Sequence, residues 1–242
     1  SGIFPIADWE ENDFEYVGSN IKQDDNGIQL SQKSYVNSRL ETVEIPKHII
    51  LDDSADMVAK IDNQSTIGAL SWLASQSRPD LQAGVSLAQR KQKQPCYGDV
   101  RETNKVVKMA QNGKGEPLTF SKLGSTLDDL VILVYHDAAW ANAVASADDQ
   151  EFVPGGHGIY SQLGHLVLMC DRRALKGDEV NPAVIAWKSH ACPRVCRSTF
   201  AAETMASLEG WEDAIAFRAM LAGSLRGEPL SEDAVRGVVP II

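Results

Sequence analysis

The chain has 242 residues, 43% of them hydrophobic and 23% charged, an ordinary composition for a globular protein with one large core or two modest ones. No apolar run approaches the roughly 18 residues that a membrane span needs. The first residues also lack a basic region followed by an apolar core, so we expect no anchor, no secretory signal and an intracellular protein of the cytoplasm or nucleus. The four cysteines follow no disulfide framework and are expected to be free thiols.

The distribution of charge matters more than its total. A net charge of -10 argues against a nucleic-acid partner, because phosphate binding is driven by Lys and Arg. Residues 88–125, however, hold eight Lys or Arg against three acids, and residues 188–197 hold three bases and no acid. These stretches are typical of a surface that contacts a nucleic-acid backbone, and a solvated loop beside a charged helix face explains them equally well.

The first half of the chain predicts a hairpin followed by helices. Residues 14–35 alternate around a turn at residues 24–27, which indicates a β-hairpin. Helices are expected to begin within residues 32–43 and to cover residues 66–74, 80–92 and 101–111. Pro79 separates the second helix from the third, because proline disfavours a helical residue before it. We place the domain boundary at residue 125, in a stretch rich in Gly, Ser and Lys, so the chain divides into residues 1–125 and 126–242.

The second half predicts strands and then a long helix. Strands are expected at residues 130–136, about 156–162, and 165–170 or 183–188. The helix is expected over residues 198–225, because Met205, Leu208, Trp211, Ile215 and Met220 recur at a spacing near 3.6. Hairpin strands followed by a helix favour an α+β or mixed α/β fold with helices packed on a sheet.

Two acids in this half are the candidate site residues. Asp137 follows a buried apolar run and is expected at the end of a strand, and Glu203 is expected in the first turn of the long helix. Carboxylates held on two rigid elements suit hard divalent cations such as Mg²⁺. The alternatives are a turn acid at the end of a strand for Asp137 and a helix-dipole acid for Glu203. His136 is expected on the opposite face of the strand from Asp137.

Three other patterns carry less chemistry. The Asp52 and Asp53 pair looks like a loop or helix cap and not like paired polymerase aspartates. The run at residues 154–158 lacks the Lys and Ser or Thr of a phosphate loop, so we expect a turn before a strand. His190, Cys192 and Cys196 lie close in the sequence, but a structural zinc site needs four ligands and no second pair is near.

Several short motifs together resemble one family. Residues 135–141 (YHDAAWA), 156–160 (GHGIY), 185–189 (IAWKS) and 198–203 (STFAAE) are similar, in order and spacing, to the ribonuclease H domain of copia-type retrotransposon polyproteins. Residues 14–21, 27–35 and 68–80 resemble the segment that follows the reverse transcriptase palm in the same polyproteins. The resemblance covers most of the chain through seven weak matches in one order.

The resemblance implies a function and a set of partners. It implies a thumb or connection-like region over residues 1–125 and a ribonuclease H-like domain over residues 126–242. Such domains cut the RNA strand of an RNA/DNA hybrid with two divalent ions, Mg²⁺ or Mn²⁺, which Asp137 and Glu203 would hold. The partners would be the hybrid and the rest of the polyprotein. Candidate phosphate contacts are Lys188, Arg194 and Arg197.

The chain departs from the family pattern near residue 242. The pattern needs further aspartates on the next strand and near a later helix, and residues 238–242 look like the start of that strand. Without these carboxylates we expect weak or no cleavage from the chain as given. Two functions stay open, a ribonuclease H-type hydrolase and a remnant that binds nucleic acid or protein without catalysis.

Overall fold

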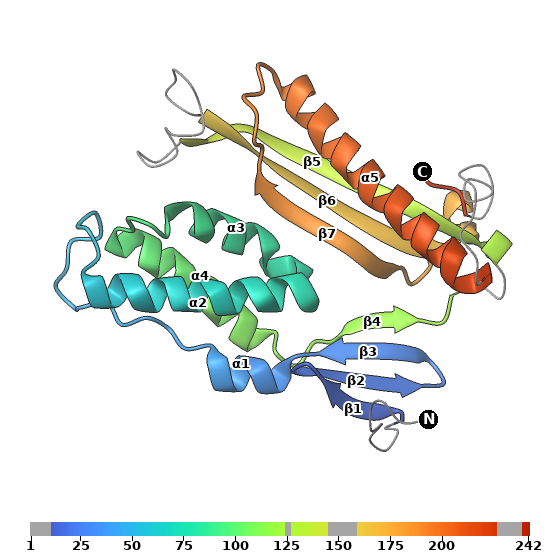
Figure 1. Ribbon diagram of the computed structural model, residues 1–242, viewed down its shortest axis with the longest axis horizontal. Helices are drawn as coiled ribbons and strands as arrows, with labels where there is room; N and C mark the ends of the chain where they lie inside the picture. Colours follow the sequence, from blue (N-terminus) through green and yellow to red (C-terminus); the bar gives the residue numbers. More distant parts are fainter. Residues whose placement is uncertain (1–10, 124–126, 145–158, 227–238) are drawn as a thin grey trace, which may run out of the picture.

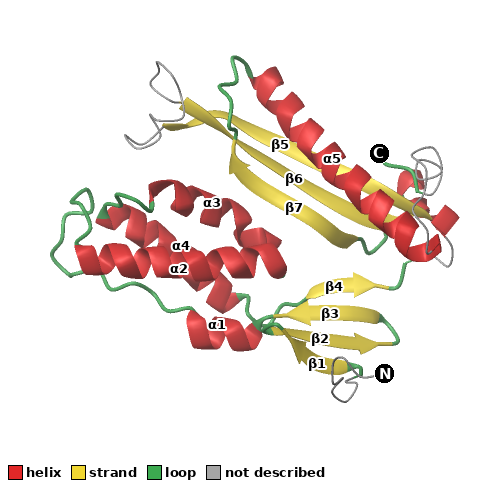
Figure 2. Cartoon of the chain, viewed as in Figure 1, coloured by secondary structure: helices red, strands yellow, loops and turns green. Residues whose placement is uncertain are grey.

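The computed structural model describes residues 11–123, 127–144, 159–226 and 239–242. The described chain forms two antiparallel sheets and five α-helices, a mixed α+β architecture (Figure 1). The prediction of a mixed fold is confirmed at this level. The strands that precede residue 122 form one sheet and those that follow residue 129 form the other, while most helices gather in a block between them in the sequence (Figure 2).

The N-terminal sheet has four strands in the order β1-β2-β3-β4. They are β1 (Asp13–Tyr16), β2 (Ser19–Asp24), β3 (Gly27–Ser31) and β4 (Leu118–Ser121). The predicted hairpin is confirmed, because β2 and β3 pair across the turn, where Asp24 Oδ1 accepts a hydrogen bond from Asn26 N at 2.7 Å. The sequence did not predict β4, which returns after the helices to pair with β3. The N-terminal region is therefore less helical than expected.

The helical block confirms the expected helices and lengthens two of them. Its elements are α1 (Lys33–Arg39), α2 (Met57–Gln76), the 3₁₀ turn η1 (Pro79–Leu81), α3 (Gln82–Lys91) and α4 (Tyr97–Asn112). Helix α2 begins well before residue 66, because Asp56 caps it by accepting a hydrogen bond from Ala59 N at 2.8 Å. The break falls at Pro79, as predicted. Arg78 fixes that corner by donating to Ala110 O of α4 at 3.2 Å and pairing with Asp80 at 2.7 Å.

The C-terminal sheet has three antiparallel strands in the order β5-β6-β7. They are β5 (Leu130–Val144), β6 (Ile159–Asp171) and β7 (Ala183–Ala191), with the 3₁₀ turn η4 (Arg172–Lys176) between the last two. Residues 159–162 of the strand expected at 156–162 and the strand expected at 165–170 are one continuous strand, β6, while the turn expected at residues 154–158 lies outside the described residues. Strand β5 does not end at residue 136. It stays paired with β6 past Asp137 and through an irregularity between Ala139 and Ala143.

Residues 239–242 lie beside β5. Ile241 forms a parallel bridge with Ile132, and Ile132 N donates to Pro240 O while Ile242 N donates to Ile132 O, each at 2.9 Å. Val239 is buried in the same core as Ile132. The chain therefore returns to the sheet after the last helix and runs parallel to the first strand of the sheet.

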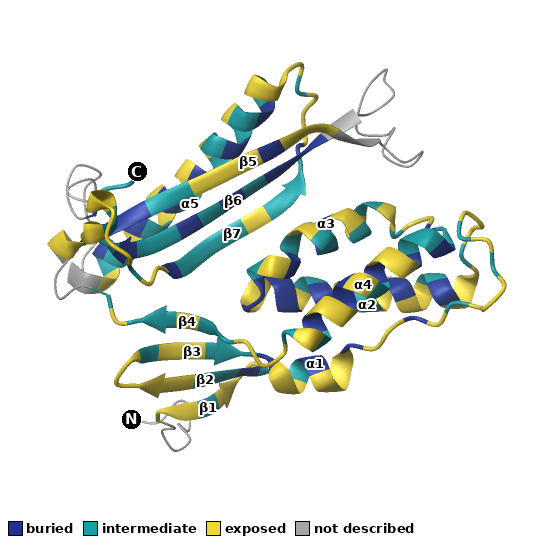
Figure 3. Cartoon of the chain, turned by 180° about the vertical axis from the view of Figure 1, so that it is seen from behind, coloured by how far each residue is buried: buried dark blue, intermediate teal, exposed yellow. Residues whose placement is uncertain are grey.

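Helix α5 (Thr199–Arg226) crosses one face of this sheet and confirms the predicted long helix (Figure 1). Small residues face the strands: Ala202, Ala206, Gly210, Ala214 and Ala222 recur every four or eight positions, and all are buried. The larger apolar residues that indicated the helix lie elsewhere. Leu208, Trp211, Ile215 and Met220 are exposed. Exposed residues lie along the length of α5 (Figure 3). The helix is therefore apolar on both sides, and only the small side is covered by the sheet.

The opposite face of the sheet meets the helical block near β7. Trp187 Nε1 of β7 donates to Ala74 O of α2 at 2.8 Å, and Gln162 Nε2 of β6 donates to Ser86 Oγ of α3 at 2.9 Å. Both side chains belong to the face turned away from α5, because they alternate with Leu163 and Lys188, whose neighbours are on α5. The sheet thus has α5 on one face and the helical block against the other.

Candidate functional site

Asp137 lies in the middle of β5 and on the sheet face turned away from α5. Its neighbours Val134, His136 and Ala138 face α5 in alternation, and Asp137 is exposed. It lines an open pocket of about 450 Å³ between the sheet and the first turn of α3, together with Tyr135 and Trp187. Within the described chain, no hydrogen bond or ion pair involves the Asp137 carboxylate. The position expected at the end of a strand is in fact internal to one.

Glu203 lies on the other face, under the start of α5. The helix begins at Thr199 behind Ser198, whose Oγ accepts a hydrogen bond from Ala201 N at 3.1 Å, so Glu203 falls in its second turn. Glu203 Oε1 accepts a hydrogen bond from Ala138 N at 3.3 Å, and Oε2 lies 3.7 Å from His136 Nδ1. The partners of Glu203 are therefore the two residues that flank Asp137.

The structure brings Glu203 next to the backbone at Asp137 without bringing the two carboxylates to one face. Nowhere in the described ranges do three or more His, Cys, Asp or Glu side chains gather in a position to hold a metal ion. A divalent cation needs several oxygen ligands pointing at one point. Glu203 instead faces an amide hydrogen and an imidazole, so these residues as placed do not fit a two-ion site.

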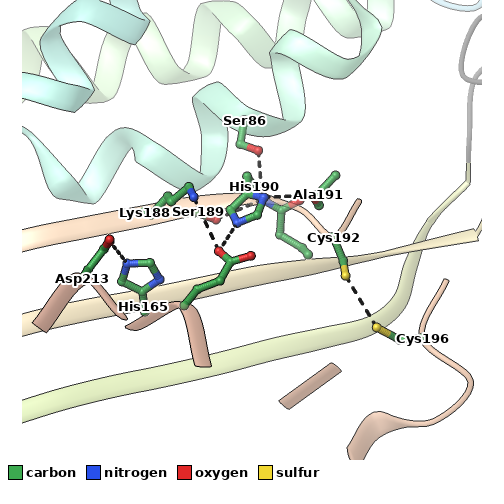
Figure 4. A network of polar contacts seen from close by, with 11 residues as sticks. Ser86, His165, Lys188, Ser189, His190, Ala191, Cys192, Cys196 and Asp213 are labelled. Atoms are coloured by element: carbon green, nitrogen blue, oxygen red, sulfur yellow. Dashed lines mark hydrogen bonds and ion pairs between the residues drawn. The ribbon is translucent and has the colours of Figure 1, made fainter. Parts of the chain in front are cut away.

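The interface between α5 and the sheet contains a row of polar pairs that the sequence analysis missed (Figure 4). His165 Nε2 lies 2.7 Å from Asp213 Oδ2, and His190 Nε2 lies 2.6 Å from Glu209 Oε2, which is also 3.6 Å from Lys188 Nζ. The His165 side chain is only 2% exposed. Each pair joins a strand residue to an acid of α5. Glu209 and Asp213 are four residues apart and therefore lie on one face of the helix. This spacing could have indicated the polar pairs from the sequence.

The three candidate phosphate contacts have different surroundings. Lys188 is half exposed and already paired with Glu209. Arg194 and Arg197 are exposed in the loop between β7 and α5, and neither forms an ion pair with any described residue. Of these three residues, Arg194 and Arg197 alone carry a positive charge that no described acid compensates.

The basic stretch at residues 88–125 is partly neutralised by its own acids. Lys91 Nζ pairs with Asp99 Oδ1 at 2.7 Å, and Lys105 Nζ pairs with Glu102 Oε1 at 2.8 Å. The Lys114 ammonium donates to Asn37 Oδ1 at 2.8 Å. Several of the basic side chains in this stretch are therefore already paired with neighbouring acids or amides. This pairing weakens the positive surface that the sequence predicts for binding nucleic acid.

Cys192 and Cys196 are neighbours in the loop before α5. Their sulfur atoms lie 3.6 Å apart, with Cys192 buried and Cys196 partly exposed (Figure 4). Burial first, and then the hydrogen bond with the Cys192 thiol, raise the pKa of the Cys196 thiol. His190 is turned to Glu209. The side chains that suggested zinc in the sequence are therefore divided between a thiol pair and a histidine–carboxylate pair.

The sequence matches no protein-family model and no curated protein. In the described part of the chain, no helix combines the length and apolar character required to cross a membrane. The proposals below therefore rest on the residues and their geometry, and on the resemblance of the short motifs.

Proposed function

We propose that the chain is a ribonuclease H-type module of a copia-type retrotransposon polyprotein, directed to RNA/DNA hybrids and weakly active or inactive as given. The observation that carries the proposal is the order of elements around β5. Three antiparallel strands are followed by α5, and residues 239–242 then return parallel to β5. The resemblance implies the same sequence of hairpin strands, helix and further strand. The motifs at residues 135–141 and 198–203 fall on β5 and at the start of α5.

The same geometry explains why cleavage is expected to be weak. Hydrolysis by this class needs clustered carboxylates to hold two ions, and Asp137 and Glu203 lie on opposite faces of β5. We therefore derive no catalytic step through Mg²⁺ or Mn²⁺ from these residues. What the chain offers to a hybrid is the exposed loop with Arg194 and Arg197, beside the strand that carries Asp137. Hybrid recognition of this kind rests on shape and on 2′-hydroxyl contacts.

A second function, that of a non-catalytic interaction module, has its own supporting observation. The outer side of α5 exposes large apolar side chains, among them Phe200 at 81%, Met220 at 62% and Leu208 at 49%. Large exposed apolar side chains mark surfaces that bind other proteins where they form one contiguous patch. The rest of the polyprotein is the partner that the resemblance implies. In this case the basic loop and the apolar helix face act without chemistry at Asp137 or Glu203.

Cleavage and binding of a labelled RNA/DNA hybrid test the proposal. The chain, Asp137→Asn and Glu203→Gln are compared in Mg²⁺ and in Mn²⁺, with an intact ribonuclease H as reference. We expect tighter binding of the hybrid than of duplex DNA of the same sequence, and cleavage far below the reference.

Two outcomes would change this conclusion. A rate comparable to the reference that is lost in Asp137→Asn would mean that the carboxylates do assemble an active site, and the expectation of weak activity would be wrong. Equal, weak affinity for hybrid and duplex DNA without cleavage would reject the hybrid-directed proposal and leave the interaction module.

A further inference from the structure

We propose that Cys192 and Cys196 form a reversible disulfide, which makes the loop between β7 and α5 a redox-sensitive site. The inference does not depend on hybrid binding or cleavage. It rests on the placement of two thiols that neither the resemblance nor the polar pairs of α5 involve.

The two sulfur atoms are already in contact. They lie 3.6 Å apart, and a disulfide requires about 2.05 Å. Three residues separate the cysteines in the sequence, so the closure moves a short stretch of loop and leaves the sheet in place. The other two cysteines have different surroundings: Cys170 is buried, and Cys96 donates from its sulfur to Asp99 Oδ2 at 3.2 Å.

The backbone holds both partners of the pair. Cys192 N donates to Ser161 O of β6 at 2.7 Å, which fixes this residue to the end of the sheet. Cys196 O accepts a hydrogen bond from Trp140 Nε1 of β5 at 3.0 Å. Because Cys192 is buried and Cys196 is partly exposed, an oxidant reaches Cys196 first and Cys192 resolves the product.

The reaction balances with a hydroperoxide as the oxidant. The Cys196 thiol gives up its proton, the resulting thiolate attacks the peroxide oxygen and the O–O bond breaks. With hydrogen peroxide the products are a sulfenic acid and hydroxide, which takes up the proton of the thiol and leaves as water. The Cys192 thiol then attacks this sulfur, the S–O bond breaks, and a second water leaves with the proton of the thiol. The thiols are oxidised, the peroxide is reduced, and a dithiol reductant restores both thiols.

The disulfide would restrict the loop between β7 and α5. This loop carries Arg194 and Arg197 and leads into the first turn of α5. Trp140 is hydrogen-bonded to the Cys196 carbonyl and is 46% exposed, so its indole is placed to report a movement of the loop.

Peptide mapping tests the proposal directly. The folded chain is treated with hydrogen peroxide, its remaining thiols are alkylated, and it is digested with trypsin under non-reducing conditions. Trypsin cleaves after Lys188, Arg194 and Arg197, so the two cysteines fall in separate peptides, residues 189–194 and 195–197. We expect these peptides to be recovered joined, and to separate after dithiothreitol. Separately alkylated peptides, or Cys196 oxidised to a sulfinic acid without a link, would overturn the proposal.

Matched variants and a spectroscopic readout complete the test. The double variant Cys96→Ser/Cys170→Ser keeps the pair and should give the same linked peptides, whereas loss of these linked peptides in it would mean that the pair does not form without the other two cysteines. Oxidation should change tryptophan fluorescence in the chain and in the double variant, and the change should be absent in Trp140→Phe. A change that persists in Trp140→Phe would come from another tryptophan and would mean that Trp140 does not sense the loop around Cys196 as inferred.

Discussion

Glu203 of α5 accepts a hydrogen bond from the backbone nitrogen of Ala138 in β5, and this contact ties the start of the helix to the strand that carries Asp137. Removing the acceptor leaves a strand amide without a partner under a helix, which costs about 1–3 kcal/mol when the site stays dry. Glu203 is 35% exposed, so water offsets part of this cost. We expect Glu203→Ala to lower the free energy of unfolding by about 1 kcal/mol in urea titrations.

The matched controls separate this structural role from a role in metal binding. Glu203→Gln keeps a carbonyl oxygen as acceptor and should retain most of the stability. Asp137→Asn should change stability by no more than about 0.5 kcal/mol, because the carboxylate is exposed and forms no hydrogen bond or ion pair with a described residue. If Mg²⁺ stabilised the parent chain but none of the three variants, or if Asp137→Asn lost more stability than Glu203→Ala, this assignment would be contradicted.

The loop arginines should contribute more to nucleic-acid binding than Lys188. Lys188 is paired with Glu209, whereas Arg194 and Arg197 are exposed without such a partner in the described chain. We expect Arg194→Ala and Arg197→Ala each to weaken hybrid binding and to reduce the slope of log affinity against log salt by about 1. Lys188→Ala should have a smaller effect.

Filter binding over a range of salt concentrations measures both quantities. Lys105→Ala serves as the control, because Lys105 is an exposed lysine paired with Glu102 on α4. A slope that falls equally for Lys188→Ala and the two arginine variants would mean that the pair with Glu209 opens on binding. A slope that falls for Lys105→Ala would move the binding surface to the helical block.

Element types were predictable where local sequence determines them. The turn at residues 24–27, the break at Pro79 and the long helix after Ser198 all follow from turn chemistry, proline geometry and helical spacing. Strand β4 was not predictable in this way, because its pairing with β3 depends on contacts across the whole helical block. The length of β5 was missed for the same reason, since pairing with β6 extends it past Asp137.

The candidate site was only partly predictable. The sequence indicated Asp137 and Glu203, and the alternation of strand residues correctly separated His136 from Asp137. The sequence did not indicate whether His136 or Asp137 faces the helix, because the covered face of the sheet depends on how α5 packs. The spacing of Leu208 and Trp211 indicated the helix, yet both are exposed. Small residues face the sheet instead, because close packing against strands favours alanine and glycine over large side chains.

Gly210 should be sensitive to any added side chain. A Cβ atom at this position would lie 2.7 Å from Val134 Cγ1, closer than real contacts allow, and 3.1 Å from His165 Cβ, closer than most real contacts. Although alanine favours a helix over glycine by about 1 kcal/mol, we expect Gly210→Ala to destabilise the chain by about 1–3 kcal/mol, because α5 has to move away from the sheet.

Gly223 of the same helix provides the control for Gly210. A Cβ atom there would meet nothing within 4 Å, so Gly223→Ala should stabilise the chain by about 0.5–1 kcal/mol. The two variants are compared by urea unfolding. If both are stabilising, α5 does not pack against β5 as closely as described.

The start of α4 should make stability depend on acid pH. Asp99 pairs with Lys91, and its Oδ2 accepts a hydrogen bond from Cys96 N at 3.0 Å in a capping box. Burial by itself would raise the pKa of the Asp99 carboxyl, but the hydrogen bonds from Lys91 and Cys96 outweigh it and hold the pKa below its ordinary value. The ionised carboxylate therefore stabilises the folded chain above the unfolded pKa of about 3.9. This contribution is lost as the pH falls through the lower, folded pKa.

Urea unfolding between about pH 6 and pH 2.5 checks this expectation, because the unfolding midpoint then falls as Asp99 is protonated. Asp99→Asn should be less stable than the parent chain by about 1 kcal/mol at pH 6, the usual cost of a lost cap, and the difference should shrink toward pH 2.5. In a Lys91→Met background the stability difference between the chain that keeps Asp99 and the Asp99→Asn variant should be smaller, because the lysine donor is gone. Asp62→Asn, on an exposed side of α2, should leave the dependence of stability on pH unchanged. If Asp99→Asn and the parent differed in stability by the same amount at every pH, the lost stability would come from altered packing or hydrogen-bond geometry and not from the charge of the carboxylate.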